Sequence, residues 1–442
     1  MLILMNIALI LRTVFFPLIR LLSLIVPALK DRAQFEYENQ LSPYSESFNK
    51  VGRKAEIAFH FSSEGELEII RPIIDQSLIQ GHYVELLFTS PSVEAKVVKL
   101  CSLYPEKVRC FRMPLVSFFP IFFGHNNYRW QSADKLLMVR YDFLPELICM
   151  KPFLSKFILF AASAKSSSNK DWRFILKRGI YQVFDDIFPT TKEDESFFRS
   201  KLDTRRVKIH GPSELRSLQI NKRQLQFNFH QNELHHALHD LIMLRPKRLM
   251  IAQLWPEELP FLQTQKLISK VSSGELLCYV APHRFDSAFV AQLRVGLEEI
   301  FKDQVPIYFI AKDAKASDVT EISKQSQLVP GVILSCLPGI LCELYPLFDK
   351  TYVGGGLGKG VHSLLEPFVA GSQIACASNV DRSTEYDIAL SLGQDISIIN
   401  SSVDFESFLS KDDYKDIDIA HFIEDNEKAL IGLLRLLEIT NA

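Results

Sequence analysis

The sequence lacks the features that would assign it to several specialised classes of protein. Its seven cysteines include no Cys-x-x-Cys pair, so neither a zinc ribbon nor a disulfide framework is indicated. Glycine (18 residues) and proline (21 residues) are too sparse for a fibrous or low-complexity chain. The net charge is only −2, from 50 basic and 52 acidic residues, which argues against a nucleic-acid binder.

What the sequence does contain is enough apolar material for a large core. Of its 442 residues, 47% are hydrophobic and 23% are charged, which excludes disorder over the whole chain. At about 100–200 residues per domain, this length predicts two or three domains.

Residues 1–30 form an apolar segment that carries cations and no acidic residue. Arg12 and Arg20 interrupt the roughly 20-residue apolar run that a membrane span requires. On a helical wheel, one arc contains the polar residues Asn6, Arg12, Thr13, Arg20 and Ser23. This pattern favours a helix whose cationic polar face lies on an anionic leaflet. A tilted single span and a cleaved signal peptide remain open, although no small-residue cleavage site follows the segment.

From residue 55 onward, short apolar runs alternate with helical stretches, which predicts βαβ units and parallel sheets. The first series of expected strands is 55–61, 83–89, 108–113, 136–140, 157–162, 181–188 and 207–210. The second series is 248–252, 276–281, 307–311, 332–335, 350–353 and 373–377.

These two series predict the domain organisation. We expect an N-terminal membrane-associated helix at 1–30, a first Rossmann-like domain at 31–212, and an irregular link at 213–245. A second Rossmann-like domain, ending in a long helix, fills 246–442. Two doubly wound α/β domains in one chain resemble the organisation of the GT-B glycosyltransferases. Such sheets bind ligands at the carboxyl ends of their strands, so we expect the site in the cleft between the domains.

The first motif lies where the first expected strand meets the first helix. It contains His60, Ser63, Gly65 and Glu66. A carboxylate at this corner lies near the positive end of a helix dipole, and Gly65 lets the backbone approach a ligand closely. Glu66 can therefore be a general base that takes a proton from an acceptor hydroxyl. The alternative is an ordinary first-turn glutamate that satisfies free backbone N–H groups.

The second motif is a glycine-rich stretch with a lysine, followed by a histidine and a glutamate four residues apart. Its members are Gly354, Gly355, Gly356, Gly358, Lys359, Gly360, His362 and Glu366. Bare backbone N–H groups and a lysine before a helix predict an anion site, and Glu366 can accept hydrogen bonds from both hydroxyls of a ribose. The stretch is not a Walker loop, because Gly360 stands where Ser or Thr would bind magnesium. The alternative is that packing of a tight turn requires the glycines.

Further motifs follow other strands. Residues 255–258 (Trp-Pro-Glu-Glu) and 281–283 (Ala-Pro-His) come at strand carboxyl ends, although each can be an ordinary turn. The aromatic run 118–123 and the basic stretch 151–178 suggest a face for an anionic lipid, with a buried strand and a solvated helix as the alternative. His235 and His239 share a helical face but lack a third ligand at a recognised spacing, so we expect no metal site.

With these motifs in order, residues from about 55 to about 380 resemble the Kdo transferase family. These enzymes move 3-deoxy-D-manno-octulosonic acid (Kdo) from CMP-Kdo to lipid A during lipopolysaccharide synthesis. The family's His-x-x-Ser-x-Gly-Glu block fits the first motif, and the resemblance makes Glu66 the catalytic base. The family's Trp-Pro-Glu and Pro-His blocks fit residues 255–257 and Pro282–His283. Gly339, Leu344–Tyr345 and residues 352–367 resemble the signature that contributes to the CMP-sugar site.

The chain departs from the family pattern at several positions. Ser363 replaces the usual asparagine after the signature histidine, and Glu214 replaces a cation. In the family's Glu-x-Glu block, Asp142 keeps one carboxylate and Arg140 reverses the charge of the other. These departures keep two alternatives open: a GT-B transferase of another nucleotide sugar, and a membrane-bound homologue without catalysis.

The resemblance implies an inverting transferase that needs no metal or other cofactor. Its expected partners are CMP-Kdo, a lipid A precursor and a membrane surface. Its expected location is the cytoplasmic face of the inner membrane of a Gram-negative bacterium. The sequence does not indicate an oligomeric state.

Overall fold

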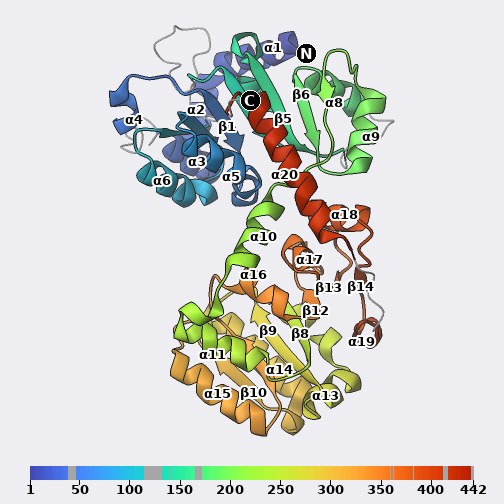
Figure 1. Cartoon of the computed structure of the whole chain (residues 1–442). Helices are drawn as coiled ribbons and strands as arrows, with labels where there is room; N and C mark the ends of the chain where they lie inside the picture. Colours follow the sequence, from blue (N-terminus) through green and yellow to red (C-terminus); the bar gives the residue numbers. More distant parts are fainter. Residues whose placement is uncertain are drawn as a thin grey trace. The chain divides into compact units, whose positions relative to one another are not determined.

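The protein consists of two compact units, each built around its own parallel β-sheet (Figure 1). The computed structural model describes residues 1–37, 46–113, 132–140, 142–164, 172–358, 360–361, 363–381, 383–411 and 417–439. The first unit comprises residues 1–216 and 424–442, and the second comprises residues 217–423.

The first unit holds a seven-stranded sheet in the order β3-β2-β1-β4-β5-β6-β7, in which all neighbours pair parallel. Its strands are β1 (Ile57–Phe61), β2 (Val84–Phe88), β3 (Val108–Arg112), β4 (Lys135–Val139), β5 (Lys156–Ala162), β6 (Asp186–Pro189) and β7 (Lys208–Ile209). Every residue of β1 and β2 is buried, which explains why the sequence shows continuous apolar runs here. The strand order reverses between β1 and β4, because β2 and β3 lie on one side of β1 and β4 to β7 lie on the other.

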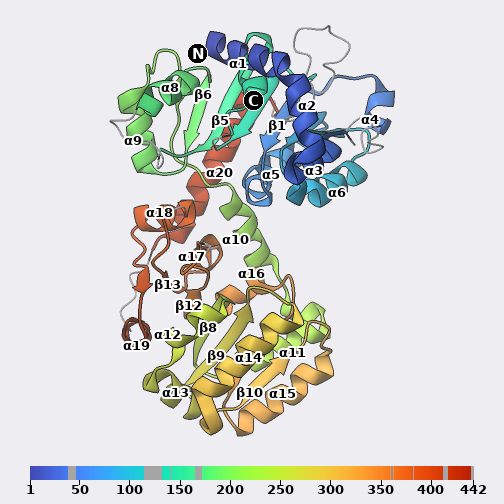
Figure 2. The ribbon, with the colours of Figure 1, turned by 180° about the vertical axis from the view of Figure 1, so that it is seen from behind.

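The helices of the first unit begin with three that follow one another on its surface, α1, α2 and α3 (Figure 2). The helices are α1 (Leu2–Val14), α2 (Phe16–Ile25), α3 (Pro27–Tyr37), α4 (Glu46–Val51), α5 (Glu64–Ile79), α6 (Glu94–Leu103), α7 (Pro145–Ile148), α8 (Trp172–Tyr181) and α9 (Lys192–Lys201). Beyond helix α20 (Ile419–Leu436), the chain returns to the amino edge of the first sheet. There Lys135, the first residue of β4, donates to the Leu437 carbonyl and to Glu438, each at 2.7 Å. The last described residues of the chain thus lie at the amino edge of this sheet.

The second unit holds another seven-stranded parallel sheet, in the order β10-β11-β9-β8-β12-β13-β14. Its strands are β8 (Lys247–Leu254), β9 (Leu276–Pro282), β10 (Ile307–Ile310), β11 (Val332–Ser335), β12 (Lys350–Val353), β13 (Gln373–Ala377) and β14 (Ser397–Ile399). The order reverses between β8 and β12, beside the first strand of the unit, as it does beside β1 in the first sheet.

Alternate residues of β8 pack into two separate apolar cores of the second unit. Leu249 and Ile251 of β8 belong to one apolar cluster, and Met250 and Ala252 belong to the other. The surrounding helices are α10 (Arg216–Gln226), α11 (Glu233–Ile242), α12 (Leu259–Leu262), α13 (Gln265–Ser272), α14 (Ser287–Phe301), α15 (Ala316–Leu328), α16 (Leu341–Leu344), α17 (Leu365–Val369), α18 (Thr384–Ser391) and α19 (Ser402–Ser410). Both faces of the sheet are therefore covered, as a doubly wound sheet requires.

The fold class predicted from the sequence, two doubly wound parallel α/β domains, is confirmed. The boundaries differ in three places. The expected irregular link at 213–245 is mostly helical and forms α10 and α11, and residues 217–245 belong to the second unit. The final helix, which we expected in the second domain, belongs to the first unit from Glu424 onward. The expected strand 181–188 is shorter, because Tyr181 ends α8 and only Asp186–Pro189 pairs in the sheet.

Candidate functional site

The residues of the first motif meet at the carboxyl edge of the first sheet, where the strand order reverses. His60 lies in β1, Glu66 lies in the first turn of α5, and Asp142 follows β4. The charge of Asp142 raises the pKa of both His60 and Glu66, so Asp142 lies within electrostatic reach of both side chains. Ligands of doubly wound sheets bind at such reversal points.

Glu66 is held in place by the two serines that precede its helix. Ser63 caps α5, and its hydroxyl accepts a hydrogen bond from the Glu66 N–H at 3.3 Å. Glu66 Oε2 accepts hydrogen bonds from the Ser62 N–H at 2.7 Å and the Ser62 hydroxyl at 2.8 Å. Glu66 thus accepts a hydrogen bond from a backbone N–H at the start of its own helix, as the alternative interpretation of an ordinary first-turn glutamate predicted. Among the described residues its second oxygen, Oε1, has no hydrogen-bond donor, which leaves this oxygen available to a ligand.

Burial is the main influence on the ionisation of this cluster. It raises the pKa of the Glu66 carboxyl above its usual value, while the Ser62 hydrogen bonds and the charge of Arg140 oppose the rise. Burial also lowers the pKa of His60 to about 4, against the charge of Asp142, so His60 is neutral at neutral pH. His60 Nε2 lies 3.1 Å from the Thr89 hydroxyl. The cluster therefore contains one carboxyl with a raised pKa and a neutral histidine, an arrangement suited to proton transfer.

Unusual backbone conformations collect at the carboxyl ends of the central strands. Of the six described non-glycine residues with a positive φ, Arg140 after β4, Ala161 in β5 and Gln253 in β8 have angles of 62°, 53° and 54°, whereas Lys302 and Glu438 follow helices. Ser363, close to the glycine-rich stretch, has a φ of 50°. Such conformations are costly for residues with a side chain and cluster at functional sites. Their position agrees with sites at the carboxyl edges of both sheets.

A buried carboxylate lies at the reversal point of the second sheet. Glu258 follows β8, is 1% exposed, and accepts hydrogen bonds from the Trp255 N–H at 3.1 Å and the Tyr352 hydroxyl at 3.0 Å. It also accepts the Gly355 N–H at 2.9 Å, so it ties the end of β8 to the end of β12. Burial raises the pKa of this carboxyl, although hydrogen bonds from the Tyr352 hydroxyl and from the Trp255, Gly355 and Gly356 N–H groups oppose the rise.

This arrangement changes the interpretation of the glycine-rich stretch. A Cβ at Gly354 would lie 2.3 Å from the Gln253 carbonyl oxygen, and a Cβ at Gly356 would lie 2.7 Å from the Cβ of Ala377. Close packing therefore requires both glycines, as the alternative interpretation stated. The Gly355 N–H, which we expected to be bare, donates to Glu258. By contrast, Cβ atoms at Gly358 and Gly360 would meet nothing within 4 Å, so the second half of the stretch is the open part.

Helix α10 contacts two other residues of the expected CMP-sugar site, Gly339 and Glu366. It does so through Arg223 and Gln224, which the sequence analysis did not identify. Arg223 pairs with Glu343 through Nη2 at 2.6 Å and approaches the Gly339 carbonyl at 3.5 Å. Gln224 donates to the Glu366 carbonyl at 2.9 Å. Burial alone would lower the pKa of Arg223, but neighbouring groups that include its partner Glu343 and the charge of Glu366 raise it above its usual value. These contacts bring the loop after β11 and helix α17, which follows β12, to the same helix, across more than 100 residues of sequence.

The two short motifs that follow β8 and β9 lie side by side. The rings of Trp255 and His283 stack with centroids 4.5 Å apart, and the His283 N–H donates to the Leu254 carbonyl at 3.2 Å. Pro282 is the last residue of β9 and is buried. Trp255, Pro282 and His283 therefore share the carboxyl edge with Glu258 and the glycine-rich stretch.

Glu214, which replaces a cation of the resembled family, has a structural role. It is 3% exposed, its N–H donates to Asn426 of α20 at 2.6 Å, and its carboxylate accepts the Arg216 N–H at 3.1 Å. The charge reversal at this position is accommodated by local hydrogen bonds within the first unit.

Several predicted residues do not contribute to the described site. Lys359, His362 and the aromatic run 118–123 lie outside the described residues. In the basic stretch 151–178, Lys151 pairs with Asp185, and Lys156 lies 3.0 Å from Asp186. Because these two cations are paired with carboxylates of the protein, the stretch carries less unpaired positive charge than its composition suggested.

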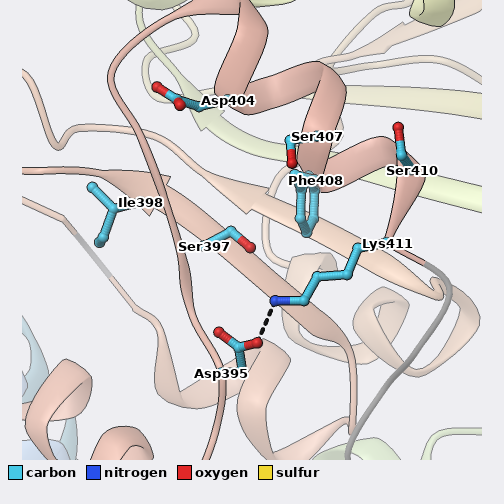
Figure 3. Close-up of a pocket in the computed structure, with 8 residues that line it drawn as sticks. All are labelled: Asp395, Ser397, Ile398, Asp404, Ser407, Phe408, Ser410 and Lys411. Carbon is cyan, nitrogen blue, oxygen red and sulfur yellow. Dashed lines mark hydrogen bonds and ion pairs between the residues drawn. The ribbon is translucent and has the colours of Figure 1, made fainter.

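The part of the chain that the structure describes contains no group of three His, Cys, Asp or Glu side chains able to hold a metal ion. A cavity of about 590 Å³ does occur in the second unit, between β14 and α19 (Figure 3). Asp395 and Lys411 form an ion pair at its wall. Lys350, the first residue of β12, donates to the carbonyls of Phe408 and Lys411 beside it, which places the cavity near the amino edge of the sheet. It lies away from the candidate site residues, and we assign it no function.

These sheets and sites define an α/β protein with two Rossmann-like domains. Solved structures identify the fold as GT-B type, which glycosyltransferases and UDP-GlcNAc 2-epimerases share. A UDP-GlcNAc 2-epimerase from Methanocaldococcus jannaschii is similar with a TM-score of 0.54 and 10% identity, over 87% of this chain and 100% of that chain. A glycosyltransferase from Rickettsia africae is similar with a TM-score of 0.50 and 12% identity, over 88% of this chain and 100% of that chain.

About half of the chain is also similar to a domain described as CMP-Kdo binding. The C-terminal CMP-Kdo binding domain of WaaA from Acinetobacter baumannii covers 50% of this chain and 98% of its own, at 18% identity and a TM-score of 0.32. No protein-family model and no curated protein matches the chain.

Proposed function

We propose that the protein is an inverting glycosyltransferase that moves Kdo from CMP-Kdo to a lipid A precursor, with Glu66 as the general base. The observation that carries the proposal is the position of Glu66. Its carboxylate lies at the reversal point of the first sheet, with Oε2 held by Ser62 and Oε1 without a donor among the described residues. The resemblance of the first and second motifs to the Kdo transferase family supplies the choice of sugar.

The proposed reaction is a single displacement. Glu66 accepts the proton of the acceptor hydroxyl, and the hydroxyl oxygen forms a bond to the anomeric carbon of Kdo. The bond from that carbon to the phosphate oxygen breaks, and CMP leaves with the electron pair. A positioned general base contributes roughly 10²–10⁴ to such a rate.

On the donor side, we assign the open half of the glycine-rich stretch to the CMP phosphate. Gly358 and Gly360 leave room for close approach, and Lys359 between them supplies a positive charge. Fixed donors at the position where negative charge develops stabilise the leaving group. We assign Glu366 to the ribose, and Pro282, His283 and Gly339 to the walls of the donor site.

On the acceptor side, we assign His60, Ser63, Gly65 and Asp142 to the support of Glu66 and its hydroxyl substrate. A lipid acceptor places the enzyme at a membrane, and we propose the cytoplasmic face of the inner membrane of a Gram-negative bacterium. The exposed apolar segment at the N-terminus supports this location.

We expect CMP to stabilise the protein against heat more than UDP or GDP does. A ligand at ~100 times its dissociation constant adds about 2.7 kcal/mol, which raises the Tm of a 150–250-residue unit by about 5–10 °C. Differential scanning calorimetry of the full-length protein with each nucleotide measures this shift, with cytidine as the control for the phosphate. Stabilisation by UDP without stabilisation by CMP would contradict the proposed donor and favour another nucleotide sugar.

A further inference from the structure

A buried ion pair joins helix α1 to the short helix that follows Asp142. Arg12, near the end of α1, pairs with Glu146 of α7, whose side chain is 1% exposed. Arg12 is the only charged partner of Glu146 among the described residues. We expected Arg12 on a cationic face toward lipid headgroups, but its charge is used within the protein.

Helix α1 is a separate element of the first unit. It has 13 residues, and a bend of 58° separates Leu2–Arg12 from Phe16–Ile25. Only these two stretches taken together are long and apolar enough to cross a membrane, and no single helix in the described part of the chain is. The role of α1 within its unit therefore depends on what it contacts there.

The segment between Asp142 and the ion pair is short and well held. Three residues separate Asp142 from Glu146. The Leu144 N–H donates to the Asp142 carbonyl at 2.7 Å, and Leu144 is the residue that precedes α7. The ring of Phe143 meets the ring of Tyr181 edge to face, with centroids 5.4 Å apart. A displacement of α7 is therefore passed on to Asp142.

The start of α1 contacts the other support of this segment. Met1 packs so closely on Gly179 of α8 that a Cβ at Gly179 would lie 2.6 Å from the Met1 Cε. Tyr181, which packs on Phe143, is the last residue of the same helix. Helix α1 thus contacts both α7 and α8, the two helices that hold the segment.

The two partners of the ion pair differ in what happens when one of them is removed. The side chain of Arg12 is 23% exposed, so its guanidinium can turn to water if Glu146 is absent. Glu146 is buried, and removal of Arg12 leaves a buried charge without compensation, which is strongly unfavourable. Loss of Arg12 therefore favours movement of α7 that brings the Glu146 carboxylate to water.

We propose that Arg12 and Glu146 are positioning residues, through which helix α1 holds Asp142 within electrostatic reach of Glu66. The inference rests on the proposed role of Glu66 as the base, and it makes α1 a working part of the acceptor site.

The charges around Glu66 give the direction of the expected effect. Arg140 and Asp142, both after β4, act on Glu66, and Asp142 also acts on His60 in β1. Asp142 and Glu66 are both carboxylates, so they repel each other. A loosened segment lets them separate, which weakens the influence of Asp142 on the pKa of Glu66.

Hydrogen–deuterium exchange of the full-length protein tests the first step without turnover. In Arg12→Met, we expect the amides of residues 143–149 to exchange at least about tenfold faster than in the wild type. The double variant Arg12→Met/Glu146→Met removes the pair as a neutral unit and should exchange at the wild-type rate, because apolar side chains can replace both partners of a buried pair. Unchanged exchange in Arg12→Met overturns the inference.

The pH dependence of kcat/KM, measured with a detergent-solubilised acceptor, tests the second step. Arg12→Met should lower kcat/KM by about 10–100-fold, as expected for a misplaced group. It should also move the acid limb to lower pH, as expected for Asp142→Asn, and should add no further shift when combined with Asp142→Asn. The Arg12→Met/Glu146→Met protein should regain the wild-type limb. A merely structural loss of folded protein lowers the rate without moving the limb, and that result contradicts the positioning role, as does a shift to higher pH.

Arg20→Met is the matched control for both measurements. Arg20 is exposed on α2, so this substitution removes the same charge from the N-terminal segment and leaves Glu146 paired. Effects in Arg20→Met as large as those in Arg12→Met would assign them to net charge and reject the ion pair as their cause. Absence of transfer by the wild type contradicts the proposed function instead, and the exchange measurement then still decides whether Arg12 holds the segment.

Discussion

Replacing Glu66 with Gln is expected to lower kcat by about 10²–10⁴-fold without loss of folding, because the amide cannot accept the proton of the acceptor hydroxyl. The Gln side chain has the same shape, and its carbonyl oxygen can still accept both hydrogen bonds from Ser62. The measurement is the initial rate of CMP release from CMP-Kdo in the presence of a lipid A precursor, with Tm as the check on folding.

Glu64→Gln is the matched control for this variant. Glu64 is the first residue of the same helix, its side chain is 50% exposed, and its carboxylate pairs with Lys96 at 3.1 Å. Both substitutions remove one negative charge from the first turn of α5, but only Glu66 lies buried at the reversal point. A Glu66→Gln enzyme as fast as the Glu64→Gln enzyme would exclude Glu66 as the base.

The pH dependence of kcat/KM gives a second, signed test of the same residue. Burial raises the pKa of Glu66, so we expect activity to fall on the acid side with an apparent pKa above that of an ordinary glutamate. The charge of Arg140 lowers the pKa of Glu66 and that of Asp142 raises it. Arg140→Gln should therefore move the acid limb to higher pH, and Asp142→Asn should move it to lower pH. Shifts of the same sign in both variants would contradict this assignment.

Gly354→Ala is expected to destabilise the second unit by about 1–3 kcal/mol and to weaken nucleotide binding, because overpacking a close contact has an effect of this size. The new Cβ would lie 2.3 Å from the Gln253 carbonyl oxygen and 2.5 Å from Glu258 Oε2. Relief of these contacts must displace the carboxylate that holds the Gly355 N–H and the Tyr352 hydroxyl. Calorimetry of the full-length variant, with and without nucleotide, measures both effects.

Gly358→Ala separates packing from ligand contact in the same loop. A Cβ at Gly358 meets no atom within 4 Å, so we expect stability to stay within about 0.5 kcal/mol of wild type. If the open half of the loop holds the phosphate, this variant should still lose nucleotide affinity. Equal stability of the Gly354→Ala and Gly358→Ala proteins would contradict the packing role of Gly354.

The sequence predicted most of the fold because parallel strands buried on both faces are continuous apolar runs. It did not predict β14 (Ser397–Ile399), which is only three residues long and begins with a serine. It also predicted an irregular link where α10 forms, because that helix is mostly polar and buries only Ser217 and Ile220. Short or polar elements give a weak periodic signal, and their structure depends on contacts with distant residues.

The candidate site was partly predictable for a similar reason. Motifs that follow strands were placed correctly at the carboxyl edges, because parallel topology determines where strand ends meet. The roles of Glu258 and Arg223 were not predictable, since they depend on partners about 100 residues away, such as Gly355 and Glu343. The ion pair of Arg12 with the buried Glu146 of α7 was not predicted either. A helical wheel groups polar residues on one face of a helix but does not show whether protein or solvent lies against that face.

The central claim is that the protein transfers Kdo from CMP-Kdo to a lipid acceptor with Glu66 as base. The most direct measurement is mass spectrometry of a tetraacylated lipid A precursor after incubation with CMP-Kdo and the full-length protein. We predict a gain of Kdo on the lipid with wild-type protein and little or no gain, in the same time, with the Glu66→Gln variant. An unchanged lipid mass with wild-type protein that still binds CMP would contradict the claim and indicate a homologue that retains the fold without this transfer.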